Sequence, residues 1–291
     1  MAEQMEKNNL VQEKNAVNIL VDGLTLFDDD LMSKVFDQNI EATELVLRII
    51  LGRDIKVICV DGQDELRNPV VGGRNITLDV HAIDVNGEEI DIEVQGNSEG
   101  AHIRRARFHS SMVDSKMLVE GQKFKVLKDS YVIFIYKHDK FRKGLPLYHI
   151  DRYVKETDEL FDDGSHIIYV NGNYKGNDEI GRLMKDFRQT DPENIHYNAL
   201  AQGVRHFKEN EEGREEMCEA VEEYAKEYAI REKAISVKNL MANMKINLEQ
   251  ALNALGVQGD ERILITKQLI SFEDVPFVPP IAHCHEKRPL S

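Results

Sequence analysis

The stretch from Ile76 to Gly96 (ITLDVHAIDVNGEEIDIEVQG) constrains the fold more than any other part of this chain. It contains two strand-like runs on either side of Asn86-Gly87, a dipeptide typical of β-hairpin turns. The first run carries Asp79, and the second carries Glu93 and Gln95. Carboxylates on neighbouring strands can bind one divalent cation, so the pairing register decides whether this hairpin contains a site.

Two registers are compatible with this turn. A two-residue loop at positions 86 and 87 pairs Val85 with Glu88. Because side chains alternate with period two, that register sends Asp79 and Glu93 to opposite faces. A three-residue loop over 85–87, with Gly87 in the left-handed conformation of a bulged turn, places Asp79 directly across from Glu93.

We favour the three-residue loop because it gives one continuous apolar face. This register sets Leu78 against Val94, Val80 against Ile92 and Ala82 against Ile90. Directly opposed residues lie ~5 Å apart at their Cβ atoms, so Asp79 and Glu93 can share a cation. The same alternation also fits a hairpin whose polar face is simply solvated, in which case the two carboxylates are ordinary surface residues.

The composition predicts a cytoplasmic protein without a membrane partner. No apolar run approaches the ~18 residues that a membrane span needs, and the first residues lack the apolar core of a signal peptide. The three cysteines are far apart and form no CxxC pair, which indicates a reducing compartment and no structural zinc. A chain of 291 residues is long enough for one sizeable core and an appendage.

Charge is unevenly distributed along the chain. The net charge is −15, which by itself argues against a nucleic-acid partner. Residues 102–143, however, contain eleven basic and four acidic side chains, a net +7, against −22 for the rest of the chain. A basic segment directly after a candidate metal site suits a phosphodiester substrate, although it also fits a solvated helix with its loops.

Hydrophobic periodicity predicts the order helix, strand, strand, strand, helix, strand. The helices are Leu31–Phe36, Glu41–Leu51 and Ala101–Leu118, and the strands are Ile55–Val60, the two hairpin strands and Tyr131–Tyr136. Two further strands (Leu147–Arg152, His166–Asn171) and two helices (Ile180–Phe187, Tyr197–Lys208) follow.

This order, with several short motifs, resembles the PD-(D/E)XK nucleases, and within them the bacterial PD-(D/E)XK family transposases or recombination-promoting nucleases. The matching pieces are Leu78-Asp79-Val80, Glu93-Val94-Gln95, Arg105-Ala106-Arg107-Phe108-His109 with Ser111, Gly121, and Leu145-Pro146-Leu147-Tyr148. The resemblance covers residues 26–207. It implies an α/β fold with a restriction-endonuclease-like core, in which helices flank a mixed central sheet, and an α-helical C-terminal extension.

The resemblance implies a metal-dependent DNA endonuclease that hydrolyses phosphodiester bonds, associated with mobile elements or DNA recombination. Asp79 and Glu93 match the metal-binding carboxylates, and the main-chain carbonyl of Val94 supplies a further oxygen. An all-oxygen set suits Mg²⁺ or Mn²⁺. Glu44, on the preceding helix, is a further candidate ligand.

Gln95 stands where the general motif has lysine. Glutamine cannot deprotonate water and brings no positive charge, so it can only orient the nucleophile by hydrogen bonding. Arg104 or Arg105 is expected to hold a phosphate, and Lys123 and Lys125 to contact the DNA backbone.

The sequence predicts three segments: a polar N-terminal arm (1–25), a nuclease-like domain (26–208), and an acidic helical extension with a flexible tail (209–291). Ten glutamates occur between residues 209 and 232. Together with Gln95 and the overall acidity, they leave open an alternative, a catalytically weak or inactive nuclease fold that binds DNA or protein. Cutting both strands with one site per chain favours a homodimer.

Overall fold

The computed structural model describes residues 15–70, 72–96 and 100–272. The chain divides into two compact units, Met1–Val221 and Glu222–Ser291. Residues 15–23 are helical and Val21 is fully buried, so this part of the predicted N-terminal arm is packed rather than loose. The first part of that arm and the predicted tail after residue 272 lie outside the described residues.

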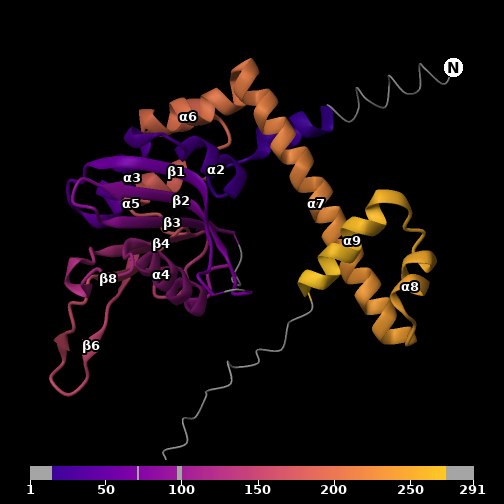
Figure 1. The fold of residues 1–291 in the computed structure, drawn as a ribbon. Helices are drawn as coiled ribbons and strands as arrows, with labels where there is room; N and C mark the ends of the chain where they lie inside the picture. The colour runs from indigo at the N-terminus through magenta and orange to yellow at the C-terminus, as the bar shows by residue number, and fades with distance from the viewer. Residues whose placement is uncertain (1–14, 71, 97–99, 273–291) are drawn as a thin grey trace, which may run out of the picture. The chain divides into compact units, whose positions relative to one another are not determined.

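A six-stranded mixed sheet forms the centre of the larger unit (Figure 1). Its strands, in spatial order, are β1 (Val57–Leu66), β2 (Ile76–Asp84), β3 (Glu89–Gln95), β4 (Ser130–Tyr136), β8 (Ser165–Asn171) and β5 (Leu147–Ile150). Neighbours pair antiparallel except for β3 with β4 and β4 with β8, which are parallel. A parallel pair needs a crossover connection, and the helix α4 (Ile103–Met117) lies in the crossover from β3 to β4.

Helices cover both faces of this sheet. On β3, Ile90, Ile92 and Val94 pack in the main core with α2 (Asp29–Phe36) and α3 (Ile40–Leu51). The alternate residues of β3 point to the opposite face, where α4 contacts them. The helices α5 (Glu179–Asp186) and α6 (Asn198–Glu209) complete the layer on the α2 side. The fold is therefore the expected restriction-endonuclease-like α/β core.

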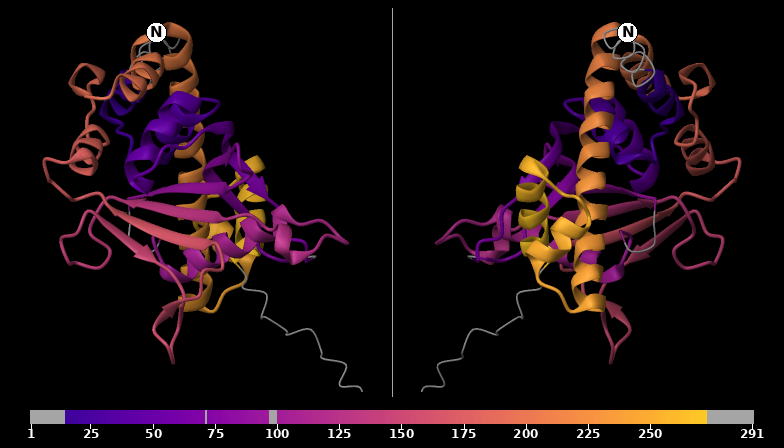
Figure 2. Two further views of the ribbon diagram at one scale, coloured as in Figure 1. Left: turned by 90° about the vertical axis from the view of Figure 1, so that its left-hand side faces the viewer. Right: turned by 90° about the vertical axis from the view of Figure 1, so that its right-hand side faces the viewer.

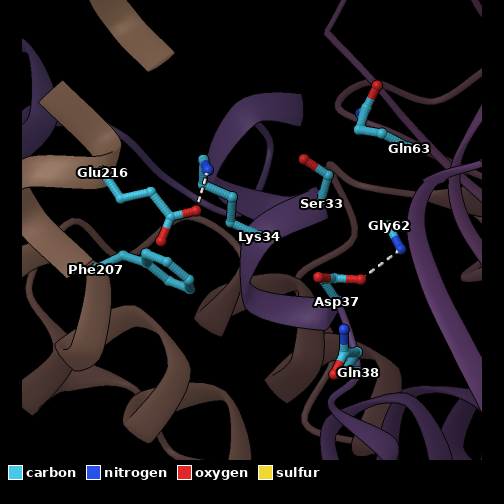
Figure 3. A pocket seen from close by; sticks show the side chains of 8 residues that line it. All are labelled: Ser33, Lys34, Asp37, Gln38, Gly62, Gln63, Phe207 and Glu216. Carbon is cyan, nitrogen blue, oxygen red and sulfur yellow. Dashed lines mark hydrogen bonds and ion pairs between the residues drawn. The ribbon is translucent and has the colours of Figure 1, made fainter. Parts of the chain in front are cut away.

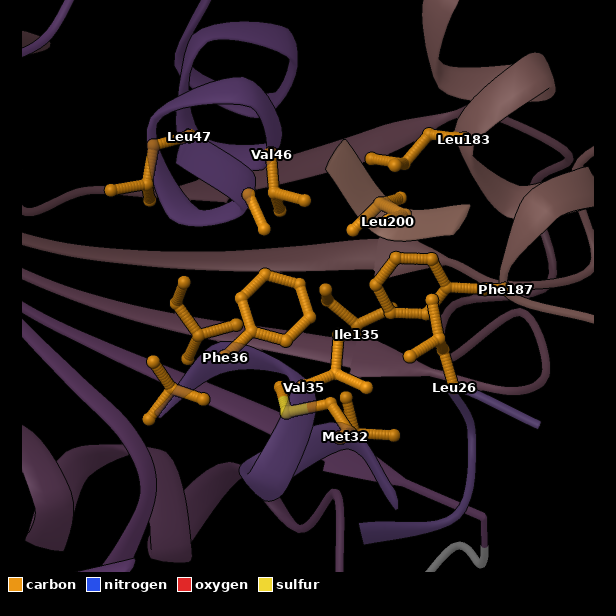
Figure 4. Packing of buried hydrophobic residues seen from close by; sticks show 14 of the residues in the cluster. Leu26, Met32, Val35, Phe36, Val46, Leu47, Ile135, Leu183, Phe187 and Leu200 are labelled. Atoms are coloured by element: carbon orange, nitrogen blue, oxygen red, sulfur yellow. The ribbon is translucent and has the colours of Figure 1, made fainter. Parts of the chain in front are cut away.

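The main core packs α2, α3, α5 and α6 onto the sheet (Figure 4). Phe36, Leu47 and Phe187 are fully buried in it, and Phe187 makes an edge-on contact with Phe27. The ends of α3 follow from its sequence. The side chain of Asn39 accepts a hydrogen bond from the helix, and Gly52 ends it in the left-handed conformation, with φ 65°.

The hairpin of β2 and β3 has the predicted register. Val80 pairs with Ile92 and Ala82 with Ile90, and the three-residue loop ends with Gly87 at φ 80°. One part of the prediction is wrong. Leu78 packs with residues of α4 in a separate cluster, rather than with Val80 in the main core, because the strand alternation changes phase next to Asp79.

Three elements differ from the sequence prediction. β1 continues to Leu66, six residues beyond its predicted end, because its polar second half still pairs with β2. A small hairpin of β6 (Tyr153–Val154) and β7 (Glu159–Leu160), which has no clear sequence signal, projects from the sheet (Figure 2). α7 (Glu211–Met244) is 34 residues long, and the division between the two units falls within it, whereas the predicted boundary at 208/209 falls at the end of α6.

The smaller unit consists of helices. Beside the second part of α7 it contains α8 (Leu248–Ala254) and α9 (Gly259–Phe272). Their buried residues are Ala234, Val237, Ala251, Leu252, Val257 and Ile265. α8 begins with a capping box in which Asn247 and Gln250 exchange side-chain to backbone hydrogen bonds. Within the described part of the chain, no helix is long and apolar enough to span a bilayer.

Candidate active site

Asp79 and Glu93 lie side by side on β2 and β3. The backbone N–H of Asp79 donates to Glu93 Oε1 (3.2 Å), and the backbone N–H of Val94 donates to Asp79 Oδ2 (2.9 Å). The side chains therefore link the two strands beyond Val80 and Ile92, where the backbone pairing ends. Asp79 is 7% exposed and Glu93 is fully buried, so the solvated-face interpretation of this hairpin is wrong.

A local irregularity in β1 accompanies the change of phase at Asp79. Gly62 pairs with Val80 and Asp64 with Leu78, which sets Gln63 opposite Asp79. Gln63 has a left-handed backbone (φ 55°), which is rare for a residue with a side chain. Such irregularities bend a strand and redirect its side chains. Here the bend turns Leu78 to α4 while Val80 remains in the main core.

α4 covers the carboxylates with two side chains one turn apart. Arg105 forms an ion pair with Glu93 Oε2, and its Nε donates to His109 Nε2 (3.1 Å). Because the guanidinium can only donate, the proton of the neutral imidazole lies on Nδ1. Nδ1 then donates to Asp91 Oδ2 (2.9 Å) and lies 3.6 Å from Glu93 Oε1.

Burial and mutual repulsion raise the pKa of all three carboxyls. Burial, followed by the charge of Asp91, raises the pKa of Glu93 to about 8. Burial and the charge of Asp79 raise the pKa of Asp91 to about 8. The pKa of Asp79 is raised well above its usual range by burial and by Glu93, with a smaller effect of Asp29 at the start of α2. When ionised, the three carboxyls carry more negative charge than Arg105 alone offsets.

We expect the metal-free protein to lose stability as the pH rises toward about 8. Asp91 and Glu93 have higher pKa values in the folded chain than in the unfolded chain. Their contribution is therefore complete below the unfolded values, near pH 4, and is lost as the pH rises through about 8. Burial lowers the pKa of His109, which gives the opposite slope, but only below about pH 6.5.

Urea unfolding in a chelator, between about pH 7 and pH 8.5, measures this loss. Asp91→Asn removes one of the titrating groups while leaving an oxygen to accept from His109, and it should make the slope shallower. A wild-type unfolding free energy that does not fall across this range would contradict the prediction.

The residues of the site fit a divalent cation. Asp91, Glu93 and His109 each offer a ligand atom within 4.8 Å of the others, and all three are buried. Asp91 Oδ1 is buried without a hydrogen-bond partner, which is costly for a carboxylate unless a cation or water satisfies it. The carboxylate of Asp79 lies on the neighbouring strand, where its Oδ2 accepts from the backbone N–H of Val94. Oxygen-rich sets of this kind suit hard cations such as Mg²⁺ and Mn²⁺.

Asp91 and His109 were not predicted as site residues. Both had a sequence signal: Asp91 precedes Glu93 by two residues on one strand face, and His109 follows Arg105 by one helical turn. The sequence did not show that α4 packs on this face of the sheet, and this packing brings Asp91 and His109 together.

Glu44 was predicted as a possible ligand, and this prediction is wrong. Its carboxylate accepts from the backbone N–H of Val57 (3.0 Å) and pairs with Lys56. Val57 pairs with Asp84, five residues along β2 from Asp79, which corresponds to about 16 Å of extended strand. Glu44 therefore caps the start of β1 instead of reaching the carboxylate cluster.

Gln95 is partly buried at the end of β3, two residues after Glu93, where it pairs with Tyr136 of β4. Alternation along β3 puts its side chain on the α4 face, together with Asp91 and Glu93. The apolar side chain of Val94 is buried in the main core on the other face.

A basic pocket of about 580 Å³ opens next to the carboxylates. Its lining includes Asp79, Arg74, Arg104, Arg105 and His109. Arg104 is exposed, whereas Arg105 is held against Glu93. Lys123 and Lys125 are exposed beyond the other end of α4, so the structure does not bring them into this pocket.

A second pocket, of about 390 Å³, lies between α2, β1, α6 and the start of α7 (Figure 3). Its charged side chains are already engaged. Lys34 pairs with Glu216, and Asp37 accepts from the backbone N–H of Gly62 (2.9 Å). The pocket has neither the carboxylate cluster nor the surplus of arginine that marks the pocket beside Asp79.

Comparison with known proteins identifies one family. Residues 50–180 match the family described as PD-(D/E)XK nuclease family transposase. The match spans all six strands of the sheet and α4, and thus Asp79, Asp91, Glu93 and His109. No curated protein and no solved structure gives a match.

Proposed function

We propose that this protein is a metal-dependent endodeoxyribonuclease, because residues 50–180 match the PD-(D/E)XK nuclease family transposases. The observation that carries the proposal is the buried cluster of Asp79, Asp91 and Glu93 beside a pocket lined by arginines. A cation offsets the repulsion among the carboxyls, and the arginines attract a phosphodiester. The substrate is DNA, and one site per chain favours action as a homodimer.

Asp79 and Glu93, with the carbonyl oxygen of Val94, would hold Mg²⁺ or Mn²⁺. Bound there, the cation lowers the pKa of a water molecule and offsets the charge that develops on the phosphate and the leaving oxygen. Asp91 keeps the proton of His109 on Nδ1. Gln95, with an amide but no titratable group, orients the attacking water.

Arg105 has two possible partners in this proposal. In the metal-free protein it pairs with Glu93 and donates to His109 Nε2. With a cation held at Glu93, Arg105 would no longer be needed to balance the carboxylate charge, and its guanidinium would turn toward a phosphate in the pocket. This movement also frees His109 Nε2 as a proton acceptor. Arg74 and Arg104 add charge for the neighbouring phosphates.

Incubation of the purified protein with supercoiled plasmid tests the proposed activity. We expect nicked and linear products with Mg²⁺ or Mn²⁺ and none in a chelator. Cleavage that persists in the chelator would contradict a metal-dependent mechanism, and absence of cleavage with either metal would contradict the nuclease assignment.

The ion pair of Arg105 with Glu93 supports a second candidate function. If the guanidinium stays on Glu93, the carboxylate cluster is neutralised internally, and Gln95 supplies no replacement for the usual lysine. The chain then acts as a DNA- or protein-binding module on a nuclease fold. Stable DNA binding without cleavage, and without thermal stabilisation by Mn²⁺, would distinguish this candidate from the enzyme.

A further inference from the structure

The outward face of α4 leads from the basic pocket to a basic loop. Arg104, Arg107, Ser111 and Ser115 are exposed on this face at helical spacing. The one acidic residue of α4, Asp114, is half-buried and accepts from Ser130 Oγ (2.9 Å). The face thus combines arginines with short serines and has no exposed carboxylate of its own. A phosphate backbone can approach such a face closely.

The loop that follows, residues 118–128, presents an aromatic ring between lysines. Phe124 is 85% exposed, and Lys123, Lys125 and Lys128 are exposed around it. In the described part of the chain, none of these lysines forms an ion pair with a carboxylate. At this exposure the Phe124 ring buries almost no apolar surface, so packing in the core does not account for a phenylalanine at this position.

The backbone of this loop is held in a defined conformation. Gln122 donates from its N–H to the carbonyl of Val119, and its side chain accepts from the Val119 N–H (2.9 Å). Gly121 has a left-handed backbone at φ 87°, and Phe124–Val126 then form a 3₁₀ turn. Phe124 is therefore presented on an ordered turn, which lowers the entropic cost of contacting a ligand.

We propose that Phe124 stacks on an unpaired base of DNA while Lys123 and Lys125 contact the flanking phosphates, so that the protein selects DNA with unpaired bases away from the cleaved bond. This inference rests on the proposed nuclease function. The carboxylate cluster contacts α4 at Arg105 and His109, whereas Phe124 follows the C-terminal end of this 15-residue helix, so the stacked base lies away from the cleaved bond. Aromatic stacking beside basic side chains is the usual means of binding single strands.

A second exposed aromatic loop of the larger unit has the opposite charge. Phe161, beside the small hairpin of β6 and β7, is 58% exposed. Its neighbours in the sequence are acidic: Asp158, Glu159, Asp162 and Asp163. Both rings are exposed, but of these two loops the Phe124 loop is the one whose charge favours contact with a nucleic acid. Phe161 is therefore a matched control.

The chain contains no tryptophan, so Phe124→Trp introduces one fluorescent reporter at the proposed contact. We expect its emission to be quenched by a single-stranded oligonucleotide, and by a duplex with a central unpaired gap, in buffer without divalent cations. Phe161→Trp should show no quenching. Equal quenching of the Phe124→Trp emission by a fully paired duplex would overturn the selection of unpaired bases.

Affinity provides the second readout. Phe124→Ala should weaken binding of the gapped duplex by between about 5-fold and 150-fold, because base stacking on an aromatic ring is lost, and Phe124→Tyr should retain binding. Equal affinities for wild type and Phe124→Ala would overturn the proposal. So would a blue shift of the Phe124→Trp emission with anionic lipid vesicles and not with DNA.

The two hypotheses fail separately. Plasmid cleavage without quenching at position 124 would support the nuclease function and contradict the stacking of Phe124 on a base. Quenching without any cleavage would support the stacking of Phe124 on a base and favour the function as a DNA-binding module.

Discussion

Asp79→Asn and Glu93→Gln each reduce metal-dependent cleavage of DNA by about 100-fold or more, while they raise the stability of the metal-free protein. The loss of activity follows from removing one of the carboxylates that we propose to hold the cation. The gain in stability follows from removing a charge from a buried site in which the pKa values of Asp79, Asp91 and Glu93 are raised. Both substitutions keep an oxygen that can accept the backbone hydrogen bond from the facing strand.

Plasmid cleavage with Mn²⁺ and thermal unfolding in a chelator measure the two effects on the same samples. Glu44→Gln is the matched control, because Glu44 has a similar chemistry but lies at the start of β1. It should leave cleavage unchanged. Activity losses accompanied by lower stability would indicate misfolding instead, and undiminished cleavage by either site variant would contradict the assignment of the metal ligands.

The register of the β2–β3 hairpin was predictable from the sequence because a strong constraint acts on it. A shift of one residue would move Val80, Ala82, Ile90 and Ile92 out of the core, and this cost exceeds the preference of Asn86-Gly87 for a two-residue turn. The opposition of Asp79 and Glu93 follows directly from that register. The sequence pattern therefore predicted that these two carboxylates lie side by side before any tertiary contact was known.

The other partners of this pair could not be predicted, because they depend on how α4 packs. The alternation along β3 is the same whether its polar face meets water or a helix, so it gave no reason to place Asp91 in the site. Arg105 was expected to meet a phosphate, and only its contact with Glu93 gives it a role in balancing charge. The position of Glu44 could not be predicted, because helical spacing shows which face of the helix a residue occupies. It does not show which point along the sheet that residue reaches.

Arg105→Ala destabilises the metal-free protein and at the same time increases its stabilisation by Mn²⁺. Glu93 is fully buried, and removal of its cationic partner costs about 3 kcal/mol. For a unit of this size, that corresponds to a fall in Tm of about 6–12 °C. The cation then binds without displacing a guanidinium, so the increase in Tm with Mn²⁺ should exceed that of the wild type.

Arg104→Ala is the control for this comparison. Arg104 lines the same pocket, but among the described residues its guanidinium makes no hydrogen bond to the carboxylates. Differential scanning fluorimetry with and without Mn²⁺ should therefore give a wild-type response for Arg104→Ala. If the Mn²⁺ response of Arg105→Ala equals that of the wild type, the guanidinium and the cation do not compete for Glu93. In that case a cation would not drive Arg105 from Glu93 to a phosphate. The better explanation of the site would then be a binding module in which Arg105 neutralises Glu93 permanently.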